Sequence, residues 1–133
     1  EYLENYGAPI HPNELVKHQC LSYTGFSTYP DWRLVSEDKV VTIRPKGAIK
    51  SNDNEGLLIA ARHGLGIVAG STWLMAKAMS KGQLVRILPE WSFNIDSGVY
   101  LVRPSSAYTS AKVDAFKHFI ESKFEKQTPW DGS

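Results

Sequence analysis

Helix-forming and strand-forming segments alternate from Ser51 to Leu88 with only short connections, and this alternation constrains the fold more than any other feature of the chain. Asn52 and Glu55 have the spacing of a capping box, which predicts a helix that runs to about His63. After that helix we expect a strand, a second helix capped by Gly70-Ser71-Thr72, and another strand, over residues 65–69, 73–80 and 84–88. Such alternation is typical of a layered α/β domain.

The segments on either side are shorter. Before Ser51 we expect two helical turns, a strand and a two-stranded hairpin, over residues 1–6, 12–18, 20–23, 32–35 and 40–43. Residues 91–97 have the composition of a polar linker, and a strand over 99–103 and a helix from Ser110 to Phe124 follow it. Since a lone strand and helix cannot cover each other's apolar surfaces, we expect them to complete a second lobe whose other strands precede Glu1.

Composition limits the kinds of partner. The chain has 133 residues, of which 42% are hydrophobic, so one packed core is expected. Lys+Arg number 15 against 14 Asp+Glu, and the basic residues are scattered, which disfavours nucleic-acid binding by this chain. No apolar stretch approaches the roughly 20 residues of a membrane helix. The single cysteine, Cys20, cannot form an internal disulfide, which favours a reducing compartment and a cytoplasmic location.

Several fragments carry a family resemblance through their order and spacing. They are Tyr2-Leu3-Glu4 with Gly7 and Pro9, Pro12 to Leu15, His18-Gln19-Cys20-Leu21, Trp32-Arg33, Ser51-Asn52-Asp53 with Glu55, Ala60-Ala61, Gly64-Leu65-Gly66-Ile67, Gly82-Gln83-Leu84-Val85 and Leu88-Pro89-Glu90-Trp91. Over nearly its whole length the chain resembles the effector-binding region of LysR-type transcriptional regulators. Residues 99–104 and 110–124 are similar to the last strand and helix of that family.

The resemblance implies a bilobed α/β domain like the type 2 periplasmic binding proteins, with an effector held between the lobes. Residues 1–94 would form the second lobe, and residues 95–133 would cross back to supply the returning strand and helix of the first lobe. The family's winged helix-turn-helix, its linker helix and most of its first lobe have no counterpart here. Ala69-Gly70-Ser71 and Lys77-Ala78-Met79 depart from the family's commoner pattern, which leaves the identity of the effector open.

Four places are candidates for effector contacts. The loop after the first strand resembles the family segment that reaches into the cleft, and its hydroxyls and the Gly25 amide could bind a carboxylate; a solvated loop is the alternative. Two expected helix starts offer backbone amides to an anion, with plain capping as the alternative. Arg103 ends the returning strand and could face the effector or only solvent. The candidate residues are Tyr23, Thr24, Gly25, Phe26, Ser51, Asn52, Ser71, Thr72 and Arg103.

The sequence does not support dinucleotide binding, a structural zinc site or a hydrolase. The glycine pattern Gly64-x-Gly66-x-x-x-Gly70 begins after a helix and before a strand, the reverse of a dinucleotide fingerprint, and its spacing also differs. The four histidines lie on unrelated elements, and His18 with Cys20 is too small a set for structural zinc. Ser71 lacks the Gly-x-Ser-x-Gly elbow of a hydrolase. We therefore expect no catalytic residues, no metal and no cofactor.

The sequence thus predicts the effector-sensing domain of a LysR-type regulator and not an enzyme. The expected partners are a small-molecule effector, with anionic compounds as candidates, and further copies of the chain. DNA would be contacted only through a domain absent from this chain, and no membrane contact is expected. The alternatives are a fragment of a solute-binding transport protein, a small α/β hydrolase that uses Ser71, and a purely structural oligomerisation piece.

Overall fold

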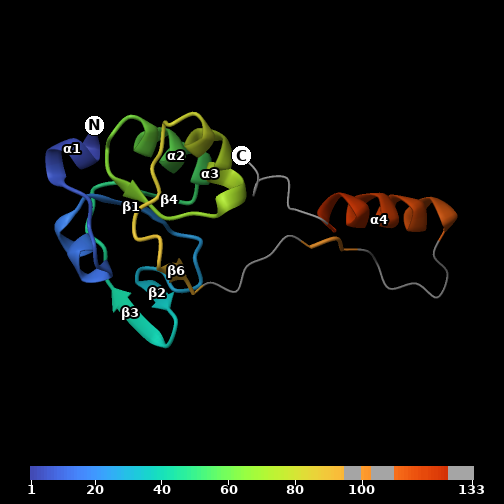
Figure 1. The fold of residues 1–133 in the computed structure, drawn as a ribbon, viewed down its shortest axis with the longest axis horizontal. Coiled ribbons are helices and arrows are strands. Elements are labelled where there is room, and N and C mark those ends of the chain that lie inside the picture. The colour runs from blue at the N-terminus through green and yellow to red at the C-terminus, as the bar shows by residue number, and fades with distance from the viewer. Residues whose placement is uncertain (95–99, 103–109, 126–133) are drawn as a thin grey trace.

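Residues 1–94, 100–102 and 110–125 are described by the computed structural model, whose ribbon is drawn in Figure 1. The N-terminal elements are α1 (Tyr2–Tyr6), the 3-10 helix η1 (Pro12–Lys17), β1 (Cys20–Tyr23), β2 (Trp32–Ser36) and β3 (Lys39–Ile43). They are followed by β4 (Lys50–Ser51), α2 (Asn54–Arg62), β5 (Ile67–Val68), α3 (Thr72–Ser80), β6 (Ser92–Phe93) and α4 (Ala111–Phe124).

The first sheet is parallel and has the order β4-β1-β5. Tyr23 of β1 pairs with Ser51 of β4, and Leu21 of β1 pairs with Val68 of β5. The apolar side of α2 covers one face of this sheet, where Leu21 and Leu57 are each only 1% exposed and pack with Ala61. Figure 1 shows α2 and α3 together beside the sheet. Parallel strands need crossover connections, and α2 provides the one between β4 and β5.

The second sheet is antiparallel and has the order β3-β2-β6. β2 and β3 form a hairpin, and β6 pairs with Leu34 and Val35 on the other side of β2. Trp32, Leu34 and Ile43 of this sheet belong to the same buried cluster as Cys20 of the first sheet, together with Tyr2, Leu15, Ile67, Ala69 and Leu88. Both sheets are therefore held by one shared hydrophobic core.

Two glycines are required by close approaches of the backbone. A Cβ atom at Gly47 would collide with the carbonyl oxygen of Cys20, and one at Gly66 would collide with that of Gln19. Gly66 also has a φ of 154°, which side chains rarely adopt. These glycines let the segments before β4 and β5 lie directly against the start of the central strand β1.

Most of the expected elements are confirmed. The helical turns, the strand that begins at Cys20, the hairpin, and the helix, strand and helix after Ser51 all occur. Gly7 ends α1 with a φ of 77°, and the Ser110 side chain accepts a hydrogen bond from the Val113 amide at the start of α4. The expected α/β layering is therefore present.

Three local predictions are wrong. Residues 84–88 form no strand, because Leu88 has a positive φ of 51° and the backbone turns there. Residues 91–97 are not wholly a linker, because Ser92 and Phe93 form β6. Of the strand expected over 99–103, residues 100–102 are described and lie outside any strand, while its two ends fall outside the described residues. A strand needs a partner, and none lies beside these three residues in the described part of the chain.

The capping box is also wrong in detail. Asp53, and not Asn52, is the N-cap of α2, and its side chain accepts a hydrogen bond from the Glu55 amide. An aspartate and an asparagine in neighbouring positions are both good caps, so the local pattern could not distinguish them.

Helix α4 lies apart from the other elements in Figure 1. None of its residues is buried, and its apolar side chains Val113, Phe116, Phe119 and Phe124 are 38 to 56% exposed. The assignment of residues 95–133 to a first lobe stays a prediction. Among the described helices, none combines the length and the apolar character that crossing a bilayer would require.

Candidate effector-binding edge

Three loops of the candidate site follow the carboxyl ends of three neighbouring parallel strands. The loop after β1 begins at Thr24, the start of α2 follows β4, and the start of α3 follows β5. The Thr24 amide donates a 2.9 Å hydrogen bond to the Ser51 carbonyl oxygen, which ties the first two loops together. The structure therefore brings the predicted residues other than Arg103 to one edge of the sheet, the edge at which α/β folds bind ligands. We call it the carboxyl edge.

The loop after β1 is held by aromatic contacts. The rings of Tyr23 and Phe26 meet edge to face at 5.1 Å between centroids. Gly25 lies inside this turn, and a Cβ atom there would stand 2.6 Å from the Tyr23 ring. Phe26 also lies 5.9 Å from Phe93, which meets Trp32 at 5.3 Å. A continuous row of rings thus connects the loop to the second sheet.

The start of α2 uses its own polar groups. The Ser51 hydroxyl accepts a 3.0 Å hydrogen bond from the Asp53 amide, and the Asp53 carboxylate accepts one of 3.0 Å from the Glu55 amide. Asp53 and Glu55 both place negative charge at this helix end, where it competes with a bound anion. This geometry favours capping as the role of the turn, while effector contacts by Ser51 and Asn52 stay a prediction.

The start of α3 differs from that of α2. Ser71 occupies the N-cap position, but its side chain makes no capping hydrogen bond, and the first turn carries no acidic residue. The Ser71 carbonyl oxygen accepts from the Leu74 and Met75 amides at 3.2 and 3.3 Å. Thr72 is exposed. Of the two helix starts on the carboxyl edge, this one keeps its positive end and its hydroxyls available to a ligand.

Two other observations bear on the site. Arg103 lies outside the described residues, so its relation to the carboxyl edge stays a prediction. Phe93 was missed at the sequence level, because its neighbours read as a polar linker and nothing local indicates pairing with β2. Over the described ranges, no three His, Cys, Asp or Glu side chains gather closely enough to hold a metal ion.

A family model decides what kind of domain this is. The model of the LysR substrate binding domain matches residues 1–125. The chain belongs to this LysR family. Its mixed α/β structure is the periplasmic-binding-protein-like fold of the regulatory domains in LysR-type regulators, as expected.

Individual proteins agree with the family. The transcriptional activator TtdR of Escherichia coli O6:K15:H31 is 30% identical over 121 residues, which cover 90% of this chain and 38% of TtdR. Full-length AphB, the virulence activator of Vibrio cholerae, superposes with a TM-score of 0.62 at 26% identity over 70% of this chain and 32% of AphB. The regulatory domain of AphB from Vibrio vulnificus, at 22% identity, shows the shared fold with a TM-score of 0.72 over 91% of this chain and 59% of that domain.

The LysR relatives are transcriptional regulators, which supports the expected regulatory role and gives no support to the transport and hydrolase alternatives. This chain spans 36% of the length of PtxR from Pseudomonas aeruginosa and 38% of TtdR.

Proposed function

We propose that this chain is the effector-sensing part of a LysR-type regulator and that the effector binds at the carboxyl edge. The observation that carries the proposal is the convergence of three loops on the ends of β4, β1 and β5. The proposed contacts are Tyr23, Thr24, Gly25 and Phe26 from the first loop, Ser51 and Asn52 from the second, and Ser71 and Thr72 from the third. Arg103 would approach from the segment that crosses back to the first lobe.

The polarity of the carboxyl edge favours a polar effector with an acidic group. Hydroxyls on Thr24, Ser71 and Thr72 can donate to a carboxylate, and the first turn of α3 adds its positive end. Asp53 and Glu55 repel an anion at α2. We therefore infer that an acidic group would lie toward α3, with the rings of Tyr23 and Phe26 against a less polar part of the molecule.

The proposed mechanism is a change in the angle between two lobes. Residues 1–94 would form one wall of the cleft, and residues 95–133 would contribute to the other. An effector shifts such an equilibrium only if it binds one lobe arrangement more tightly than the other. In the complete regulator, a cytoplasmic homo-oligomer, that shift would alter DNA binding by a separate domain.

The test is a thermal-shift screen of the complete regulator against a library of small organic acids. We expect at least one acid to raise the melting temperature, and we expect Ser71→Ala and Thr24→Ala to weaken its binding by roughly tenfold each. Ser80→Ala is the matched control, because Ser80 lies at the far end of α3 and its hydroxyl donates to the Lys77 carbonyl. Equal binding by all three variants would place the effector elsewhere.

The isolated chain offers a second test. Since it would supply only one wall of the cleft, we expect calorimetric titration to show much weaker binding than in the complete regulator. Affinity as tight as that of the complete regulator would contradict a cleft shared by two lobes.

A further inference from the structure

A basic hollow lies on the face of the parallel sheet opposite the face that α2 covers. Its volume is about 470 Å³, and its lining includes Ser22, Tyr29, Arg44, Lys46, Gly47 and Lys50. Leu21 packs under α2, so the alternation of side chains along β1 directs Ser22 to the other face. Ser22 and Lys50 are register partners, whereas the next pair, Tyr23 and Ser51, belongs to the carboxyl edge. Ser22 and Lys50 therefore lie on the face away from α2, while Tyr29 comes from the loop that also carries Thr24, Gly25 and Phe26.

Positive charge in the hollow exceeds negative charge. The Arg44 guanidinium donates from Nε and Nη2 to the two carboxylate oxygens of Asp31 at 2.8 and 3.2 Å. This pair also holds the pKa of the Asp31 carboxyl below its usual value, so Asp31 stays charged at neutral pH. Lys46 and Lys50 form no ion pair with any residue that the structure describes. Two cationic charges thus remain uncompensated among the lining residues, in a chain whose formal net charge is +1.

The backbone holds these cations in place. The Cys20 amide donates to the Lys46 carbonyl oxygen at 2.7 Å, and the Ser22 amide donates to that of Ile49 at 3.1 Å. Gly47 lies so close to the Cys20 carbonyl that no side chain fits between them. The segment from Arg44 to Lys50 is therefore fixed against the central strand, and a ligand would not have to order it.

We propose that this hollow binds a small dianion, such as inorganic phosphate or the phosphate group of a small metabolite. The Lys46 and Lys50 ammonium groups supply the charge, and Arg44 keeps three N–H donors beyond the two that Asp31 accepts. Ser22 is 4% exposed and belongs to the lining of the hollow. Hydroxyls of Ser22 and Tyr29 complete the donor set. Its cationic side chains are not among the proposed effector contacts.

A different role for the lysines makes a different prediction. β4 is an edge strand of the described sheet, and lysines on such edges prevent pairing with other chains. Lysines that only protect an edge bind anions weakly and without saturation, whereas a binding site saturates.

The experiment is a titration of the ¹⁵N-labelled chain with sodium phosphate, with NaCl adjusted to keep the ionic strength constant. We expect saturable changes in amide chemical shifts at residues 22, 29 and 46–50. A parallel titration with malonate distinguishes a phosphate site from one that accepts any dianion. The variant Lys46→Gln/Lys50→Gln should bind phosphate more weakly by a factor of roughly ten or more, because it removes two charge-assisted contacts.

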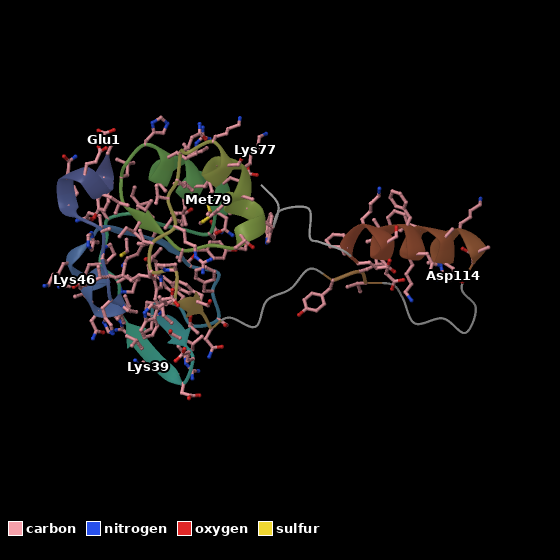
Figure 2. All side chains as sticks on the ribbon, viewed as in Figure 1. Glu1, Lys39, Lys46, Lys77, Met79 and Asp114 are labelled. Carbon is pink, nitrogen blue, oxygen red and sulfur yellow. The ribbon has the colours of Figure 1, made fainter. Side chains whose placement is uncertain are left out.

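The matched control is Lys39→Gln/Lys77→Gln. These exposed lysines lie on β3 and α3, and Figure 2 shows both of them away from Lys46. The control should bind phosphate as the parent chain does, and both double variants should keep the parent amide spectrum elsewhere, because all four lysines are exposed. Linear shifts without saturation, or equal affinity in both double variants, would overturn the proposal. Binding that survives in Lys46→Gln/Lys50→Gln but is lost in Ser71→Ala would also overturn it, while supporting the effector site at the carboxyl edge.

Discussion

Cys20 is the residue at the centre of the shared core. Its side chain is 0% exposed, and its Sγ donates to the Leu15 carbonyl oxygen at 3.5 Å. Burial disfavours the charged thiolate and raises the pKa of Cys20 from 9.0 to about 12. The thiol therefore behaves as a small apolar side chain, as the strand position of Cys20 predicts from sequence.

The raised pKa makes stability depend on alkaline pH. Since only the unfolded chain loses the thiol proton between pH 9 and 12, the contribution of Cys20 to the unfolding free energy is complete below pH 9. It should fall by about 1.4 kcal/mol per pH unit above that. Urea unfolding at pH 8, 9 and 10 measures it, and Cys20→Ala should show a shallower decline. Parallel declines in both proteins would contradict the raised pKa.

Gly47 illustrates a requirement that only the structure reveals. Gly47→Ala forces the backbone away from the Cys20 carbonyl, and we expect a loss of more than about 3 kcal/mol in unfolding free energy. Gly82→Ala is the control, because it meets no atom within 4 Å and strains only a φ of 66°. That strain should cost about 1 kcal/mol. Chemical denaturation of both variants provides the comparison, and equal losses would show that the contact at Gly47 is unimportant.

At the scale of elements, helix ends could be predicted from local signals in the sequence, whereas pairing between distant strands could not. Gly7 and Ser110 mark helix ends through their own conformation or side chain, so those ends could be predicted. β6 could not, because its strand character comes from β2, more than fifty residues earlier. The loops of the carboxyl edge were each recognisable, but that they meet depends on the parallel register of three strands.

Asp53 and its neighbour Asn52 should differ in their effect on stability, because only Asp53 caps α2. Asp53→Ala removes the side chain that accepts from the Glu55 amide and should lower the unfolding free energy by about 1 kcal/mol. Asn52→Ala should leave stability within about 0.5 kcal/mol of the parent, because Asn52 is exposed and makes no capping bond. Thermal denaturation followed by circular dichroism compares them. A larger loss in Asn52→Ala than in Asp53→Ala would identify Asn52 as the N-cap, as the sequence predicts.

At the scale of the whole molecule, the apolar face of α4 is the main unsatisfied feature. Phe116 and Phe119 are 55% and 56% exposed, and no described element covers them. Exposed apolar surface of this kind promotes association. We therefore expect the isolated chain to self-associate at high concentration.

Substitutions on α4 test that expectation. Phe116→Ser/Phe119→Ser should lower the average mass measured by light scattering, whereas Lys112→Ser, on the same helix, should leave it unchanged. A monomeric parent chain at high concentration would remove the expectation, because the exposed rings would then have no measurable effect on assembly.

The shared core also determines how this part of the regulator can move. Cys20 and Trp32 belong to one buried cluster although they come from different sheets, and the rings of Phe26, Phe93 and Trp32 join the carboxyl edge to the hairpin. Well-packed interiors transmit displacement instead of absorbing it. A swing of the hairpin must therefore carry the parallel sheet with it as a single rigid body.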